Sequence, residues 1–300
     1  TGVTGAIDLT SSHGDITSTL ETQFIAGVSG AADRVGTIGN VTALTGSLFT
    51  VTGDATDAPA VLTGDITLTG NSLGKIGNIT GTVSTGTATL TGDFDRTVGN
   101  IALTAGSYTD NDTAPGAGEP AVVVAAGSVV HNAQYGFLIN TNTTIGTVTL
   151  TAAGSTSNGG VAGNVTESSS LYGGWDSLGT AGFTAAGIDA GEVSVTTMGA
   201  YKATVTDGTI NFNLDSTTAG GAGQGFGAKL SDVTLTTTGA NGGAINIGAA
   251  GFFSEVSNIT ASAAKGNITQ TGTLEAPTIS NVTARATDGN VAVGGGYLMN

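Results

Sequence analysis

Cysteine is absent from the 300-residue chain, and proline and charged residues are scarce. The lack of cysteine excludes disulfides and thiolate metal sites. Charged residues make up 10% of the chain, against about 25% in a typical globular protein, which leaves few acids and bases for catalysis. Seven basic residues stand against 22 acidic ones, for a formal net charge of −15. We therefore expect no enzyme and no nucleic-acid partner.

Long hydrophobic runs are also missing. The longest apolar block of its kind, Ala121–Ala126, is far shorter than the 18 or so residues of a membrane span. We therefore predict no transmembrane segment. The chain opens at Thr1 without the basic and apolar regions of a signal peptide, which indicates a processed product or a piece of a longer protein.

Glycine, threonine and β-branched residues dominate what is present. Hydrophobic residues make up 39% of the chain and the mean hydropathy is +0.22, which argues against disorder. Valine, isoleucine and threonine favour strands because branching at Cβ suits a pleated surface. Glycine interrupts almost every stretch that is long enough for a helix. The sequence therefore predicts an all-β fold.

Short phrases repeat near the C-terminal end of the sequence. Ser257–Ala261 returns as Ser280–Ala284, and Gly266–Ile268 returns as Gly289–Val291, both 23 residues later. Agreement between two separate phrases on one offset indicates a structural repeat of that length.

A related phrase repeats in the N-terminal third. Ile76–Ile79 returns as Val98–Ile101 after 22 residues, and a similar phrase, Ile38–Thr42, stands 38 residues before the first copy. The offset of 38 fits either two coils of which one is shortened, or one coil that carries a loop.

A repeat of about 22–23 residues favours a parallel β-helix, or β-solenoid, because a propeller blade needs about 40 to 45 residues. Neighbouring coils would stack about 4.8 Å apart, so about thirteen coils would form a rod about 60 Å long. Parallel connections favour a right-handed coil. We expect valine and isoleucine to point inward in columns and threonine to point outward. Asparagines at matched positions, Asn258 with Asn281 and Asn267 with Asn290, should hydrogen-bond between coils.

Two stretches interrupt the repeat and divide the chain. Asn111–Pro120 holds two of the four prolines, and Ser168–Gly191 is rich in glycine and serine. We therefore predict solenoid coils over residues 1–110, a solenoid region with irregular loops or an insertion over 111–191, and further coils over 192–300. Neither end of the sequence carries a recognisable cap.

Few residues are candidates for chemistry. His13 and His131 have no partner at catalytic or metal-binding spacing, so we expect surface or loop positions for both. Calcium takes oxygen ligands from carboxylates, which makes the paired aspartates in turn-like phrases its candidate ligands; solvated turn carboxylates are the alternative. These aspartates are Asp93, Asp95, Asp110 and Asp112. No other cofactor is predicted.

Large aromatic residues gather in Ser168–Gly191, which includes Tyr172, Trp175 and Phe183. Tyrosine and tryptophan are enriched at binding hot spots, so this loop is a candidate partner contact. The alternative is a loop that folds over the solenoid wall and buries its aromatic rings.

The Thr/Gly/Ala/Val-rich phrase Gly77–Asp93 resembles bacterial surface-layer proteins and large repetitive adhesins, and Ser257–Gly272 is similar to the coils of filamentous-haemagglutinin-type β-helices. The resemblance implies an extracellular structural protein of the cell surface. We therefore predict a subunit that associates with its own copies in a surface layer, sheath or filament. One alternative is an adhesin or fibre segment that binds a receptor or glycan through Ser168–Gly191. Another is a polysaccharide-processing enzyme. A glycan or the cell envelope is the alternative partner to further copies of the chain.

Overall fold

The structure is a computed structural model of the chain. It describes residues 3–11, 15–22, 37–45, 64–72, 74–83, 86–106, 126–136, 143–153, 163–173, 196–218, 228–239 and 242–298. These residues form 29 β-strands and no helix, which confirms the all-β prediction. The strands pair in parallel, so the described part of the chain is consistent with a β-helix or solenoid-like fold.

The strands form two parallel sheets, which we call sheet A and sheet B. Sheet A contains β1 (Val3–Thr4), β2 (Ile7–Ser11), β4 (Thr37–Ile38), β5 (Val41–Thr45), β7 (Lys75–Ile76), β8 (Ile79–Val83), β10 (Thr97–Val98), β11 (Ile101–Ala105), β13 (Thr143–Ile145), β14 (Val148–Ala153), β17 (Thr196–Met198), β18 (Tyr201–Thr206), β21 (Ala228–Leu230), β22 (Val233–Thr238) and β27 (Ile279–Asp288).

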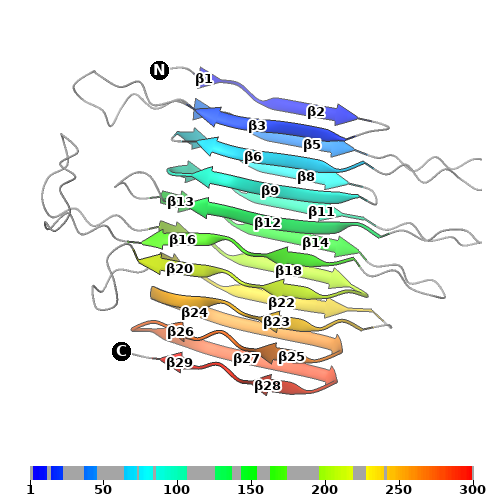
Figure 1. The fold of residues 1–300 in the computed structure, drawn as a ribbon, viewed down its shortest axis with the longest axis vertical. Helices are drawn as coiled ribbons and strands as arrows, with labels where there is room; N and C mark the ends of the chain where they lie inside the picture. The colour runs from blue at the N-terminus through cyan, green and yellow to red at the C-terminus, as the bar shows by residue number, and fades with distance from the viewer. Residues whose placement is uncertain are drawn as a thin grey trace, which may run out of the picture.

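Sheet B contains β3 (Ile16–Thr22), β6 (Ile66–Ser72), β9 (Thr87–Phe94), β12 (Ser128–Tyr135), β15 (Val165–Glu167), β16 (Ser170–Gly173), β19 (Ile210–Phe212), β20 (Asp215–Thr218), β23 (Ile245–Ile247), β25 (Ile268–Gln270), β26 (Leu274–Glu275), β28 (Val291–Val293) and β29 (Tyr297–Leu298). The long strand β24 (Ala250–Lys265) begins in sheet B and continues in sheet A. Figure 1 shows the two sheets running in opposite directions across one stack.

Each passage of the chain through sheet A and then sheet B forms one level of the stack. Eight successive pairings in sheet A, from β1–β4 to β24–β27, join nine described levels. At about 4.8 Å per step the stack is about 40 Å long. The estimate of about thirteen coils is wrong because most levels use more residues than the repeat.

Level length varies along the stack. The repeat of 22–23 residues separates Ile76 from its partner Val98, and Val256 from its partner Ile279. Elsewhere the offset between paired residues is larger, for example 53 residues from Thr143 to Thr196. Thr37 pairs directly with Lys75, so the ambiguous offset of 38 is one level that carries extra chain. The residues added to the longer levels lie largely outside the described ranges. So do the boundaries predicted after residues 110 and 191, and that division stays a prediction.

The core lies between the two sheets, where alternate residues of each strand point inward. One inward column runs down sheet A and another down sheet B, and both are apolar apart from the phenol of Tyr201. The sheet A column is Ile7, Val41, Ile79, Ile101, Val148, Tyr201, Val233, Ile259 and Val282. The sheet B column is Ile16, Ile66, Ala88, Val129, Val165, Ile210, Ile245, Ile268 and Val291. Inward stacking of valine and isoleucine is therefore confirmed for these strands.

Side-chain amides connect successive levels outside the core. Asn281 Nδ2 donates to Asn258 Oδ1 at 2.9 Å, as predicted. Asn267 and Asn290 are also linked, but there the backbone N–H of Asn290 donates to Asn267 Oδ1, at 2.9 Å. Such bonds tie each level to the next at fixed register.

Glycine sets the backbone conformation near the C-terminal end of β9. Gly92 has a φ of +97°, in the left-handed region that side chains rarely adopt. A Cβ at this position would also collide with the carbonyl oxygen of Gly70 in the level above. Both the backbone dihedral angle and the close contact with the level above therefore favour glycine at this position.

Candidate functional site

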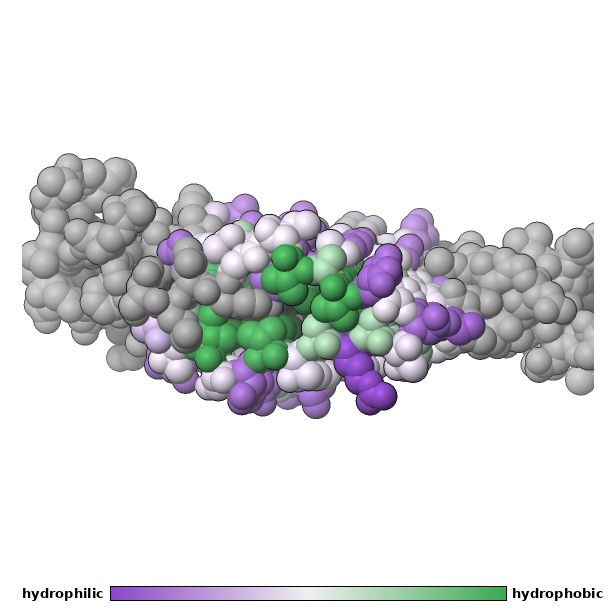
Figure 2. Space-filling view, turned by 90° about the horizontal axis from the view of Figure 1, so that it is seen from below, coloured by the Kyte–Doolittle hydropathy of each residue, from purple (hydrophilic) through white to green (hydrophobic). Residues whose placement is uncertain are grey.

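The last described level leaves the core open. Strands β27 and β28 each pair along one edge only among the described strands. Three large apolar side chains are exposed there, Val282 at 41%, Val291 at 45% and Val293 at 59%. Figure 2 looks onto this end and shows apolar residues gathered near its centre with polar residues around them. We call this surface the open face.

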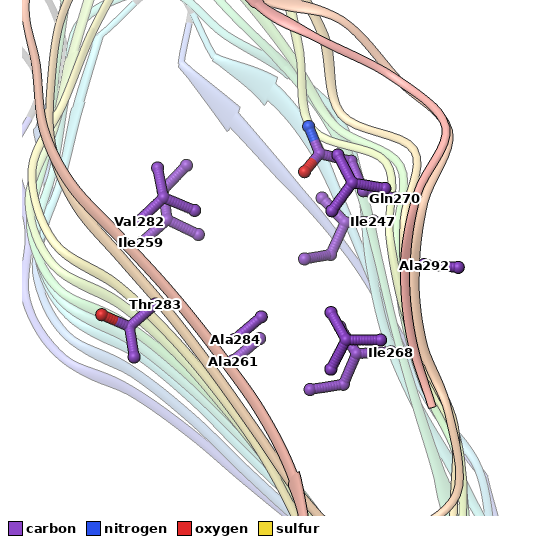
Figure 3. A pocket seen from close by; sticks show the side chains of 11 residues that line it. Ile247, Ile259, Ala261, Ile268, Gln270, Val282, Thr283, Ala284 and Ala292 are labelled. Carbon is purple, nitrogen blue, oxygen red and sulfur yellow. The ribbon is translucent and has the colours of Figure 1, made fainter. Parts of the chain in front are cut away.

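A hollow of about 260 Å³ enters the core at the open face. In Figure 3 the side chains of Ile259, Val282 and Ala284 project from one wall toward Ile268 on the other. Thr283 projects away from this space, as the alternation of a strand requires. The hollow is therefore the unfilled end of the core.

The first described level, at the opposite end of the stack, is apolar on its inner side and acidic on its outer side. Ile7 and Leu9 are partly buried against the core, and Ile16 is buried. Asp8 and Asp15 are exposed. Strands β2 and β3 each pair along one edge only among the described strands. The two ends are thus chemically different surfaces.

A fully buried polar cluster lies in the middle of the stack. His131 of β12 and Glu167 of β15 are register partners in neighbouring levels of sheet B. His131 Nδ1 lies 2.7 Å from Glu167 Oε2, and His131 Nε2 lies 2.7 Å from the hydroxyl of Tyr135. The second carboxylate oxygen of Glu167 accepts the backbone N–H of Ser169 at 2.8 Å.

Burial also changes the acidity of the tyrosines around this cluster. It raises the pKa of Tyr135 well above its ordinary value, and the negative charge of Glu167 adds to the shift. Burial likewise raises the pKa of Tyr201, whose ring packs on Phe212 with centroids 4.9 Å apart, and Glu167 again contributes. The side chains of His131, Glu167 and Tyr135 are fully buried. Their hydrogen bonds therefore contribute to the packing and register of the core.

The expectation that His131 is a surface or loop residue is wrong. It occupies an inward position of β12 in phase with the buried Val129, Ala133 and Tyr135. This alternation of inward positions was the signal that sequence reasoning missed. His13 lies outside the described residues.

The calcium candidates are only partly described. Asp93 is half-buried near the end of β9, and Asp95 is buried just after this strand. Burial lowers the pKa of the adjacent Arg96, an effect that the charge of Asp95 opposes. Asp110 and Asp112 lie outside the described residues. No group of three or more histidine or acidic side chains suited to a metal occurs in the described part, and the calcium site stays a prediction.

The aromatic candidates for partner contact are likewise divided. Tyr172 is half-buried in β16, whereas Trp175 and Phe183 lie outside the described ranges. Their role in partner binding stays a prediction.

No protein-family model, curated protein sequence or solved structure matches this chain. Within the described strands and turns there is no helix of the length and apolar character that crosses a bilayer. The resemblance to surface-layer proteins and adhesins remains a prediction from the sequence.

We expect a double-mutant cycle to reveal strong coupling between His131 and Glu167. His131→Leu leaves a buried carboxylate without its imidazole partner and should lower the free energy of unfolding by about 3–5 kcal/mol. His131→Leu combined with Glu167→Leu removes the buried charge and should cost less than the single change. Urea unfolding of the four proteins measures both effects. Losses that simply add would contradict the buried pairing.

We also expect two of the five tyrosines to resist ionisation in the folded chain. Tyr135 and Tyr201 have raised pKa values in the folded state, whereas the unfolded value is about 10. The stability that they contribute is therefore complete below about pH 10 and falls as the pH rises further. Absorbance titration of tyrosinate, in folded and unfolded protein, counts the protected groups. The variants Tyr135→Phe and Tyr201→Phe should each have one protected tyrosine fewer. Ionisation of all five tyrosines over the same pH range would contradict the burial.

Proposed function

We propose that the chain is a closed, right-handed β-solenoid that serves as a self-assembling structural subunit of an extracellular surface layer, sheath or filament. The observation that carries the proposal is the parallel stack of nine described levels, in which apolar columns and backbone hydrogen bonds hold each level to its neighbours. Stacks of this kind are quasi-one-dimensional, because each level contacts only the levels next to it.

The distribution of polar groups favours a mechanical role over a catalytic one. The polar cluster around His131 and Glu167 is buried in the core. Threonine accounts for much of the outward wall; in one column of sheet A, for example, Thr42 and Thr260 are exposed and Thr80 is half-exposed. A stiff stack with a polar wall and an apolar core suits a subunit that carries load in a polymer.

The proposal is tested by the association state of the purified chain. Light scattering and electron microscopy should show polymers whose amount rises with protein concentration. Added sodium chloride should promote association, because it screens the repulsion between subunits of net charge −15. A protein that stays monomeric at every concentration and salt level, with and without calcium, would contradict the proposal.

A further inference from the structure

We propose that the outer side of sheet A binds ice, through a regular array of threonine hydroxyls whose spacing matches the repeats of the ice lattice. This activity is additional to the structural role proposed above and does not depend on it. The surface involved is the wall of the stack, between its two described ends.

Threonine recurs at two neighbouring outward positions of sheet A in level after level. The first column runs from β5 to β27 and holds threonine at six of its eight positions: Thr42, Thr80, Ala102, Thr149, Lys202, Thr234, Thr260 and Thr283. The second column lies two residues farther along the strands and carries a hydroxyl in six successive levels: Thr82, Thr104, Thr151, Thr204, Thr236 and Ser262. All of these residues are exposed or half-exposed. We call the two columns the threonine array.

Strand geometry sets the spacing of the threonine array in two directions. The strands that carry it lie one above the next in the stack (Figure 1), about 4.8 Å apart. Along each strand, residues two positions apart on the same face are separated by about 6.6 Å. Branching at Cβ restricts χ1 of threonine, so binding to a rigid surface orders these side chains at little cost in entropy. The array is therefore a preorganised two-dimensional lattice of hydroxyl groups.

The ice lattice has repeats close to both spacings. Each water oxygen is bonded tetrahedrally to four others at about 2.75 Å, so two oxygens that share a neighbour lie about 4.5 Å apart. The same tetrahedral geometry makes the repeat along the hexagonal axis eight thirds of the hydrogen-bond length, or about 7.3 Å. The two spacings of the array agree with these values to within about a tenth. A threonine hydroxyl donates one hydrogen bond and accepts two, so it can take the place of a water molecule in the lattice.

The residues of the threonine array favour ice over a charged mineral or a crystalline sugar polymer. Among its positions from β8 to β22, Lys202 is the only charged residue, although the chain as a whole has a net charge of −15. The array also contains no aromatic side chain, the residue type that supplies much of the contact energy at interfaces. A neutral partner that is recognised through hydroxyl groups fits this surface.

Sheet B does not continue such an array and provides a comparison within the same fold. In one of its outward columns, Thr67 and Thr89 are followed by Val130 and then by Thr166 and Asn211. The regular spacing of threonine hydroxyls is therefore interrupted in the middle of sheet B, and we expect ice to bind sheet A.

The closing experiment compares Thr151→Tyr with Thr89→Tyr as the matched control. Both positions are half-exposed outward threonines within a strand, the first in the threonine array and the second in sheet B. The readout is the protein concentration that halves the growth of ice crystals in a frozen sucrose solution. A tyrosine ring at position 151 holds the lattice beyond hydrogen-bond distance and should raise this concentration at least about tenfold. Thr89→Tyr should act as the unmodified chain does, and circular dichroism and urea unfolding check that both variants fold.

A third variant, Ala102→Thr, should strengthen the activity. Ala102 interrupts the first column between Thr80 and Thr149. The added hydroxyl supplies a further hydrogen bond to the lattice and should lower the concentration that halves crystal growth by about two- to tenfold. The substitution leaves the net charge unchanged, so charge does not contribute to the effect. Unchanged or weaker inhibition by folded Ala102→Thr would contradict the match between array and lattice.

The remaining outcomes separate this inference from the structural role. A folded, unmodified chain that leaves ice growth unchanged would overturn ice binding, whereas light scattering of the same sample tests self-association independently. Full inhibition by Thr151→Tyr, or equal losses in Thr151→Tyr and Thr89→Tyr, would overturn the assignment to the threonine array. Sedimentation with microcrystalline cellulose or chitin, lost in Thr151→Tyr and without any effect on ice, would overturn ice in favour of a crystalline sugar polymer.

Discussion

Stacking of inward-facing apolar side chains from each level onto the next is the interaction on which the rest of the structure depends. The columns from Ile7 to Val282 and from Ile16 to Val291 give each buried side chain its main contacts within the column and across the core. A level therefore gains most of its stability from its two neighbours rather than from itself. This constraint accounts for the composition, because inward positions need branched apolar residues and outward positions need polar residues that keep strand propensity.

The same constraint acts on the ends and on the polar cluster. In the last described level, Val282 and Val291 continue the inward columns but are exposed, because no further described strand covers them. In the middle of the stack, His131 and Glu167 follow Leu90 and precede Phe212 in one inward column of sheet B. A slip of β15 by two residues along β12 would separate His131 from Glu167 and leave both side chains buried without this partner. The cluster thus penalises wrong registers, which is the best-attested use of buried polar pairs.

The sequence predicted the all-β class and the register of particular levels, because neighbouring levels without extra residues repeat the same phrase. Asn258 and Asn281 illustrate this, because they hold the same position in a phrase that repeats after 23 residues and their side chains are hydrogen-bonded to each other. The number of levels was not predictable in this way, since inserted residues hide the repeat between Thr143 and Thr196. His131 and Glu167 were missed for the same reason. They meet across 36 residues, an offset that no local repeat reveals. The open face could not be predicted from the sequence, because the exposure of a side chain depends on which levels of the stack cover it.

Engineered disulfide formation measures the register between neighbouring levels most directly. The chain has no cysteine, so Ile259→Cys and Val282→Cys can react only with each other within one chain. Their backbones lie about 4.8 Å apart, inside the range of a disulfide. Ile259→Cys with Ala284→Cys, displaced by two residues along β27, lies roughly 8 Å apart and outside that range. We expect mild oxidation to close the first pair and not the second. Closure of the second pair, or of neither, would contradict in-register stacking.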